Sequence, residues 1–471
     1  MKKTIIFGML SVLFLLPSGS YGATSSLQIK ASGKAVRTLQ EKLVFLKYLE
    51  SDKATGYFGA LTETALKKFQ CDEKIICSGT RSSGYGVYGP KTQATLTMKT
   101  RPLEISGWIP YWRKASGTAD VIPNLQKLTS VMPFGYSLKS DGTLADTAKL
   151  TEEPWISFVA EAKKNKVLVV PSVMSGSGDL IHEILSDKTK RIALEDEITK
   201  IVKDNGFDGI DIDFEAKHSK TIDYFSTFLK GLDMRMGKKV IYCTIEARMP
   251  LDHRFSLGAK LPEGATDYAN DYKELNKYCD RVEIMAYDQG RVDVLLNSNQ
   301  PHPYAPVSDV RWVEALVSMA VKDISKNKII IGIPTYGYEY KVALTGTSTY
   351  SYQLQWPFNL KYATDIATKL GITPTRTGSN EIGFTYNPAL LNDVAPTGTD
   401  FTLIHTSTSV EIISSSIEPN PIVIQIFNYL SWSDAQAVAD KVALARKLGV
   451  KGVAVFKFDG GEDQQIWDVL R

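Results

Sequence analysis

From residue 104 to the C-terminus, short apolar runs of strand length alternate with longer stretches in which apolar residues recur at helical spacing. This alternation predicts β/α units, because each strand needs a helix to cover its outer face. We expect strands at residues 104–110, 130–134, 166–172, 209–215, 239–246, 281–287, 328–334 and 452–458. Eight such units predict an α/β fold, a (β/α)8 TIM barrel.

A different pattern precedes the barrel. Residues 56–66 are echoed by residues 86–96, and each copy has a glycine turn, a threonine suited to N-capping and a short amphipathic helix. Helical spacing also relates Val36, Leu39, Leu43 and Leu46. We therefore expect a small three-helix domain at residues 28–98 and a linker at residues 99–104, followed by the barrel domain at residues 105–471.

The predicted strand at residues 209–215 has two unlike faces. Alternate residues of a strand point to the same side, so the carboxylates of Asp211, Asp213 and Glu215 project together, and the apolar residues between them face the opposite layer. Three like charges repel one another and lose hydration, which raises carboxyl pKa values and makes a carboxyl group a general acid. A solvated acidic face on an edge strand is the simpler interpretation of a lone D-x-D pair. The clean separation of the two faces favours a catalytic barrel strand instead.

Residues 208–215, D-G-I-D-I-D-F-E, resemble the D-G-x-D-x-D-x-E signature on the fourth barrel strand of glycoside hydrolase family 18, the chitinase-type enzymes. The resemblance implies that Glu215 protonates the leaving glycosidic oxygen as general acid/base. It also implies that Asp213 orients the substrate's own 2-acetamido group, which acts as the nucleophile, and that Asp211 shares a proton with Asp213. Asp208 has the other strand parity, and we expect it to be a structural hydrogen-bonding group.

Met285-Ala286-Tyr287-Asp288 resembles the M-x-Y-D motif at the end of the sixth strand in this family. The resemblance implies that the Tyr287 hydroxyl binds the acetamido carbonyl and steadies the oxazolinium ion as it forms. Met285 and Asp288 are expected beside the substrate, where Asp288 would hydrogen-bond nearby groups.

The first and seventh strands carry weaker matches to the family, at residues 107–112 and 332–337. Two interpretations stay open for Tyr111, Trp112 and Tyr336. These rings would either line the substrate cleft, where aromatic platforms suit the C–H faces of sugars, or pack in an apolar layer.

Three other strand ends are defined less well by the resemblance. The third strand usually ends S-x-G-G in the family, and here only Ser172 matches. The eighth strand usually carries a tryptophan beneath the cleaved sugar, and Phe456 takes that place with a smaller apolar platform. At the end of the fifth strand, Glu246 and Arg248 would either pair with each other or contact sugar.

More than a hundred residues separate the seventh and eighth strands. Residues 336–427 resemble the α+β insertion that some family members carry after strand 7, which would wall one side of the cleft. Residues 433–449 then return as an amphipathic helix. Beyond the eighth strand, residues 462–463 and 466–467 look like the spore-germination-type and spore-cortex branch of the family.

The N-terminal repeat region resembles the peptidoglycan-binding domain type 1 family, whose pattern is V-R-x-L-Q, then T-G-x-F-G-x-x-T and F-Q. The matching segments are residues 36–40, 55–62 and 69–70. The resemblance implies a small helical peptidoglycan-binding-like domain that holds the protein on the cell wall. Residues 71–85 are an insertion relative to the compact form of that family.

The N-terminus predicts export. Lys2 and Lys3 precede an apolar run at residues 5–16 and a small-residue stretch, the pattern of a secretory signal peptide at residues 1–22. We expect a secreted protein of the cell wall or periplasm. Loss of these two lysines lowers the basic count from 55 to 53 against 52 acidic residues, and this balance gives nucleic-acid binding no support. No later apolar stretch approaches the roughly 18 residues of a membrane span, so no membrane partner is expected after cleavage.

The chain has four cysteines and five histidines, the residue types that form disulfides or bind metals. Cys71 and Cys77 lie close together in one loop, and in an exported protein we expect them to form a local disulfide. Cys243 and Cys279 fall in two elements that would be barrel neighbours, where they would either pair or stay as free buried thiols. The histidines show no metal-ligand spacing, so we expect no metal and no cofactor.

The composition, with 43% hydrophobic and 23% charged residues, excludes a disordered or fibrous chain. The resemblance implies a monomeric, exported, retaining glycoside hydrolase that cleaves β-linked N-acetylglucosamine polymers, either peptidoglycan or chitin. A non-catalytic, lectin-like carbohydrate-binding protein and a wall-anchored scaffold with vestigial carboxylates stay open as alternatives. Retention of Glu215 favours the enzyme. The sequence leaves open the choice between the two polymers and between endo and exo cleavage.

Overall fold

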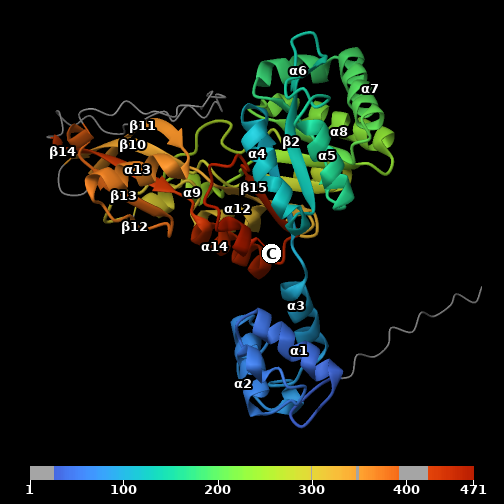
Figure 1. Cartoon of the computed structure of the whole chain (residues 1–471), viewed down its shortest axis with the longest axis vertical. Helices are drawn as coiled ribbons and strands as arrows, with labels where there is room; N and C mark the ends of the chain where they lie inside the picture. Colours follow the sequence, from blue (N-terminus) through green and yellow to red (C-terminus); the bar gives the residue numbers. More distant parts are fainter. Residues whose placement is uncertain (1–25, 299, 346–348, 392–422, 471) are drawn as a thin grey trace, which may run out of the picture. The chain divides into compact units, whose positions relative to one another are not determined.

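Figure 1 shows the computed structural model of the chain, in which residues 26–298, 300–345, 349–391 and 423–470 are described. Contacts divide the chain into two units, Met1–Arg101 and Pro102–Arg471, and each is treated by itself. The predicted signal peptide at residues 1–22 lies outside the described residues.

The first unit contains helices with the predicted apolar spacing. They are α1 (Lys34–Phe45), α2 (Ala60–Asp72) and α3 (Pro90–Thr100), with the 3-10 turns η1 (Ser51–Lys53) and η2 (Arg81–Ser83) between them. Their buried apolar faces meet in one small core that includes Val36, Leu39, Leu43, Phe58, Leu66, Phe69 and Leu96. Burial of these side chains against one another is what holds so short a helical unit together.

Two buried glutamines organise the repeat in this unit. Gln40 Nε2 donates to Thr62 Oγ1 at 2.8 Å, and Gln70 Nε2 donates to Thr92 Oγ1 at 3.0 Å. The predicted N-capping role of the two threonines is wrong, because both helices begin two residues earlier, behind glycine N-caps. Each threonine hydroxyl therefore lies inside the first helical turn, where it accepts a hydrogen bond from the repeated glutamine.

The second unit is built on a closed ring of parallel strands, and this confirms the predicted barrel. The strands are β1 (Glu104–Pro110), β2 (Ser130–Leu138), β5 (Ser172–Ser175), β6 (Gly209–Phe214), β7 (Val240–Glu246), β8 (Arg281–Met285), β9 (Ile329–Pro334) and β15 (Gly452–Phe456). Each strand pairs in parallel with its neighbours, and β1 closes the ring by pairing with both β15 and β2. A short strand β3 (Leu144–Asp146) adds to β2 in antiparallel orientation.

The third barrel position differs from the prediction. The expected strand at residues 166–172 is split into β4 (Leu168–Val169) and β5, and β5 begins at Ser172, where the predicted strand ends. Pro171 lies at the break, and it has no backbone N–H to donate to a ladder. The strand resumes beyond the proline and pairs with β6, with Ser172 opposite Asp211.

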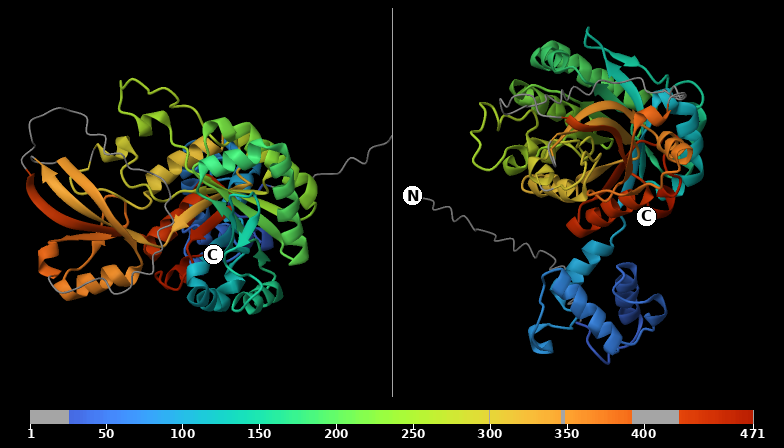
Figure 2. Two further views of the ribbon diagram at one scale, coloured as in Figure 1. Left: turned by 90° about the horizontal axis from the view of Figure 1, so that it is seen from above. Right: turned by 90° about the vertical axis from the view of Figure 1, so that its left-hand side faces the viewer.

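Helices cover the outside of the barrel (Figures 1 and 2). The longer ones are α4 (Lys114–Val121), α5 (Trp155–Lys164), α6 (Gly178–Ser186), α7 (Lys188–Asp204), α8 (Ile222–Met236), α10 (Tyr272–Tyr278), α12 (Val310–Ala320) and α14 (Ala435–Leu448). Short helices are α9 (Leu251–Arg254), α11 (Val294–Asn297), α15 (Ile466–Val469), η3 (Tyr111–Arg113), η4 (Ile122–Lys127) and η5 (Ser219–Thr221). The main hydrophobic core lies between these helices and the strands: Phe214 of β6, for example, stacks on Phe228 of α8 with ring centroids 5.7 Å apart.

An α+β insertion follows the seventh barrel strand, as predicted, and Figure 2 shows it at one side of the barrel. Its antiparallel sheet has the strand order β11 (Thr349–Phe358), β10 (Gly337–Thr345), β14 (Val423–Trp432), β13 (Ile382–Tyr386) and β12 (Thr375–Arg376). Helix α13 (Leu360–Leu370) packs on this sheet, and η6 (Pro388–Leu391) follows β13. The expected end near residue 427 falls inside β14, and residues 346–348 and 392–422 lie outside the described residues.

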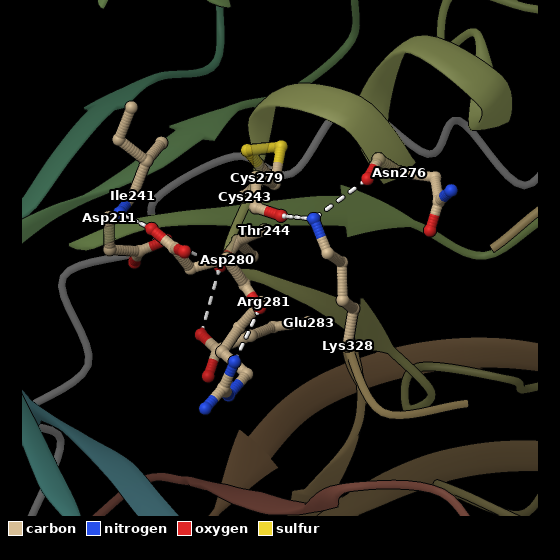
Figure 3. Close-up of a disulfide and its surroundings, with 10 residues drawn as sticks. All are labelled: Asp211, Ile241, Cys243, Thr244, Asn276, Cys279, Asp280, Arg281, Glu283 and Lys328. Atoms are coloured by element: carbon tan, nitrogen blue, oxygen red, sulfur yellow. Dashed lines mark hydrogen bonds between the residues drawn. A yellow bond between two sulfur atoms is a disulfide. The ribbon is translucent and has the colours of Figure 1, made fainter. Parts of the chain in front are cut away.

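Both cysteine pairs form disulfides. The expected local bridge joins Cys71 to Cys77. The pairing left open between Cys243 and Cys279 is present as well, and it ties β7 to the end of α10 (Figure 3). Within the described ranges, no helix is long and apolar enough to cross a membrane.

Candidate active site

The acidic residues of β6 lie inside the barrel. Asp211 is fully buried and Asp213 is 3% exposed. Glu215 follows the last residue of β6 and is partly exposed, with its backbone N–H donating to Ser175 O on β5 at 2.8 Å. Asp208 lies before the strand, where its Oδ2 accepts from Val169 N at 2.9 Å, the structural role expected for it.

Asp211 is held by donors from three other strands. Ser172 Oγ of β5 lies 2.6 Å and Trp108 Nε1 of β1 lies 3.0 Å from Asp211 Oδ2. Thr244 Oγ1 of β7 lies 2.8 Å from Asp211 Oδ1. Burial raises the pKa of Asp211, and the three donors oppose that rise because they favour the ionised form.

Asp213 has a different environment. Its Oδ1 atom is buried and has no hydrogen-bond partner among the residues that the structure describes. Burial raises the pKa of Asp213 well above its usual value, and the charges of Glu215 and Asp211 add to the rise. A buried acceptor without a donor is costly, so this atom is suited to a donor that arrives with a ligand.

Glu215 has the electrostatics of a general acid. Burial, followed by the charge of Glu246, raises the pKa of Glu215 to about 7, although Lys217 opposes this rise. A carboxyl group with a pKa near the working pH both releases and recovers a proton easily.

The loop after Glu215 is tied to β7. Ala216 has a positive φ of 53°, and its backbone N–H donates to Glu246 Oε1 at 2.5 Å. Lys217 Nζ lies 3.6 Å from Glu246 Oε2. The alternative that Glu246 pairs with Arg248 is therefore wrong for this structure: the Arg248 guanidinium stacks against the ring of Tyr268, 3.8 Å from its centroid.

Tyr287 lies just beyond the end of β8, which is separated from the acidic strand β6 only by β7. Its ring stacks on Phe456 at the end of β15, with centroids 5.3 Å apart and an interplanar angle of 16°. Gly332 of β9 makes room for this ring, because a Cβ atom there would lie 2.8 Å from Tyr287 Cε1. Burial, followed by the charge of Asp213, raises the pKa of Tyr287 well above its usual value, so its hydroxyl stays a donor.

Asp288 hydrogen-bonds nearby groups, as expected. It accepts hydrogen bonds at Oδ1 from the hydroxyls of Tyr336 and Tyr338, the latter at 2.7 Å. Tyr336 is only 4% exposed and packs with Tyr287, which places it in the apolar layer beside the acids. Met285 packs against the same cluster.

Two aromatic residues at the end of β1 are partly exposed. Tyr111 and Trp112 contact each other edge to face, with centroids 4.9 Å apart. Trp112 also packs against Phe134 of β2 at 6.0 Å. Both rings border the inner apolar cluster, in which Phe456 lies 6.0 Å from Trp108.

Sequence reasoning missed several residues of this site. Trp108 and Thr244, which hold Asp211, and Lys217, which neutralises part of the local charge, were not assigned. Glu283 of β8 was also missed, although it is fully buried in the barrel interior. The signal for Glu283 was its strand parity, since it has the same parity as Tyr287 and is the acidic residue of β8.

Together the closed barrel and its acidic strand define a (β/α)8 protein with a cluster of carboxyl groups toward the carboxyl ends of its strands. Residues 107–461 match the family described as glycosyl hydrolases family 18, and the chain belongs to this family of glycoside hydrolases. Residues 32–96 match the putative peptidoglycan binding domain.

Among curated proteins, the uncharacterized glycosylase YvbX of Bacillus subtilis is 29% identical over 198 residues, which are 40% of this chain and 52% of YvbX. The chain spans about half the length of the curated relatives it matches. Among solved structures, the spore cortex-lytic enzyme SleL of Bacillus cereus aligns with a TM-score of 0.56 and 18% identity over 79% of this chain and 74% of SleL. A class V chitinase from Pseudomonas fluorescens aligns with a TM-score of 0.57 and 21% identity over 78% of this chain and 98% of the chitinase. At these identities the structures share the fold.

Proposed function

We propose that this protein is an exported, retaining glycoside hydrolase that cleaves β-linked N-acetylglucosamine polymers by substrate-assisted catalysis. The observation that carries the proposal is a pair of neighbouring groups. Glu215 has a pKa raised to about 7, and Asp213 has a buried Oδ1 atom with no hydrogen-bond partner among the described residues. An acetamido N–H group would supply the donor that this atom lacks.

In the first chemical step, the proton of Glu215 passes to the glycosidic oxygen as the bond from C1 to that oxygen breaks. The acetamido carbonyl oxygen of the same sugar bonds to C1 and forms an oxazolinium ion. Asp213 accepts the acetamido N–H, and the Tyr287 hydroxyl donates to the carbonyl oxygen. These contacts strengthen as charge develops on the acetamido group. They therefore lower the activation free energy for cleavage of the glycosidic bond.

In the second step, water bonds to C1 on the face that the leaving group has vacated, and the bond from C1 to the acetamido oxygen breaks. The Glu215 carboxylate takes a proton from this water, so it ends the cycle protonated. Two inversions at C1 give net retention of configuration.

The substrate class rests on both units of the chain. The similarity of residues 32–96 to a putative peptidoglycan binding domain supports a wall polymer as substrate. A tethered domain raises the local concentration of the catalytic barrel at its polymer without tightening the cleft. The spore cortex-lytic name of one fold neighbour supports peptidoglycan, and the chitinase name of another supports chitin. The signal-peptide pattern at residues 1–22 supports export, and the similarity of residues 32–96 to a putative peptidoglycan binding domain supports a location at the wall.

The test is hydrolysis of peptidoglycan and of chitooligosaccharides by the wild-type protein and by Glu215→Gln. The variant should lose hydrolysis of every cleaved polymer and keep its unfolding temperature, because the amide occupies the same volume but has no acidic proton to give. Glu263→Gln, which changes an exposed carboxylate in the loop after β7, is the matched control and should stay active. Full activity in Glu215→Gln would refute the mechanism. Mass spectrometry of the products identifies the polymer and separates endo from exo cleavage.

A lectin-like, non-catalytic function is the second candidate, and Phe456 is the observation that favours it. This ring occupies the place where the family has a larger tryptophan platform, so binding of the distorted sugar would be weaker. Binding of wild-type protein to both polymers without any released product would support the lectin and count against the hydrolase.

A further inference from the structure

Glu283 is a buried acid that the proposed chemistry does not use. It lies on β8 inside the barrel and is fully buried. Its Oε1 atom is 3.3 Å from Ser106 Oγ of β1, and its Oε2 atom is 3.4 Å from Thr244 Oγ1 of β7. Figure 3 shows Glu283, Thr244 and Asp211 in the same part of the barrel.

Thr244 connects this acid to the catalytic strand. The same Thr244 hydroxyl lies 2.8 Å from Asp211 Oδ1 and 3.4 Å from Glu283 Oε2. A hydroxyl group has one hydrogen to donate and two lone pairs that accept. The shorter contact, to Asp211, takes the hydrogen. The longer contact is then a hydrogen bond only if Glu283 carries a proton and donates it to Thr244.

The surroundings of Glu283 favour the protonated acid. The charged and titratable groups around it are Asp211 on β6, Glu104 on β1, Tyr242 on β7, Arg281 at the start of its own strand and Tyr287 beyond the end of that strand. Burial, followed by the charge of Asp211, raises the pKa of Glu283 well above its usual value. Arg281 is the one cation in this set. Its guanidinium donates two hydrogen bonds to the Glu104 carboxylate and none to Glu283.

We propose that Glu283 is a positioning residue, a neutral carboxylic acid that donates to Thr244 and thereby fixes the Thr244 hydroxyl as a donor to Asp211. A fixed donor at Asp211 Oδ1 favours the ionised form of Asp211. If Asp211 and Asp213 share one proton, as the family resemblance implies, that proton then resides on Asp213, beside Glu215. This inference rests on the proposed function of the site. It adds Glu283 to Asp211, Asp213 and Glu215 as a fourth carboxyl group whose protonation state matters for catalysis.

Two substitutions separate this role from simple filling of space. Glu283→Gln keeps the shape of the side chain, is neutral like the proposed protonated acid, and offers an N–H donor to Thr244. Glu283→Met keeps the length and the apolar contacts but has no donor. We expect kcat of the glutamine variant to stay within about twofold of wild type, and kcat of the methionine variant to fall about tenfold with KM unchanged.

The control is Tyr242→Phe, which removes another hydrogen bond of a buried β7 side chain, from the Tyr242 hydroxyl to Ser130 Oγ at 3.4 Å, and leaves the Thr244 hydroxyl unchanged. It should leave kcat near that of wild type. Wild-type kcat in a folded methionine variant would overturn the proposal. Equal loss in the glutamine and methionine variants would overturn it too, since it would mean that the wild-type acid acts as an anion.

A spectroscopic measurement tests the proton without substrate. The infrared difference spectrum of the full chain, wild type minus Glu283→Gln, at neutral pH should show the C=O band of a protonated carboxyl group. A carboxylate band in its place would overturn the proposal. Because this readout needs no turnover, an absence of hydrolysis on every polymer would count against the proposed function alone, and the infrared result would still decide the state of Glu283.

Discussion

Glu246 Oε1 accepts a hydrogen bond from Ala216 N at 2.5 Å, so a carboxylate at the end of β7 is held beside the peptide that follows Glu215. Its charge is the second cause, after burial, of the raised pKa of Glu215. The contact therefore does two things: it fixes the positive φ of Ala216, and it makes Glu215 a weaker acid.

The first prediction concerns the pH dependence of hydrolysis. In the proposed mechanism, cleavage needs protonated Glu215, whose pKa of about 7 places the alkaline limb of kcat/KM near neutral pH. Glu246→Gln keeps an acceptor for Ala216 N but removes the negative charge. The pKa of Glu215 should fall, and the alkaline limb should move to lower pH. A pH profile of both proteins measures this shift, and the exposed substitution Glu263→Gln should leave the limb in place. An alkaline limb that stays fixed in Glu246→Gln would show that burial alone sets the acidity.

The second prediction concerns Tyr287. The substitution Tyr287→Phe removes the hydroxyl and keeps the ring that stacks on Phe456. If the hydroxyl serves the developing oxazolinium ion, kcat should fall about a hundredfold while KM changes little. Steady-state kinetics on a chitooligosaccharide measure both constants, and the unfolding temperature checks the fold. A rise in KM at constant kcat would instead assign Tyr287 to ground-state binding.

The barrel and its acidic strand were predictable because their signals are local. Alternation of acids with Ile210 and Ile212 is visible in six consecutive residues, and the two faces separate in the structure as the strand period requires. The third strand was predicted at residues 166–172, but the strand that pairs with β6 begins at Ser172. The sequence did not reveal this shift, because the effect of Pro171 on strand pairing depends on which neighbouring strand its backbone faces.

The partners of the acids were not predictable in the same way. Ser172, which the resemblance matched, and Thr244 come from β5 and β7, the strands that pair with β6. Trp108 comes from β1, which does not pair with β6, so its contact with Asp211 depends on closure of the barrel. The repeat threonines were misassigned for a related reason. A threonine near a helix start favours N-capping, but buried Gln40 and Gln70 compete for its hydroxyl once the core has formed.

The third prediction tests that glutamine contact in the first unit. Gln40→Leu removes the donor to Thr62 and also leaves Gly56 N without the acceptor that it has at 2.7 Å. A fully buried N–H without a partner costs on the order of 1–3 kcal/mol, and because Gly56 is only partly buried, the loss here should lie toward the lower end of that range. Hydrogen exchange of the full chain should show faster opening of α2, whereas Glu41→Gln, on the exposed side of α1, should not change it. Unchanged exchange in Gln40→Leu would mean that apolar packing alone holds the repeat.

The fourth prediction compares the two disulfides. In the chain-entropy account, a bridge stabilises the folded protein by restricting the unfolded chain, and the effect grows with loop length. The bridge between Cys243 and Cys279 spans 36 residues and the bridge between Cys71 and Cys77 spans 6. Replacing both members of a pair by alanine should lower the free energy of unfolding by about 4 kcal/mol for the long loop and by about 2 kcal/mol for the short one.

Denaturant unfolding of the second unit, followed by tryptophan fluorescence, measures the larger effect. The strand pairings of β7 should stay intact in the alanine variant, because β7 still pairs with β6 and with β8 in parallel. Thr244 therefore keeps its place beside Asp211, and hydrolysis in the absence of denaturant should persist. If activity is lost while the unfolding midpoint is unchanged, the bridge must act on the position of Thr244, and the chain-entropy account of its role is wrong.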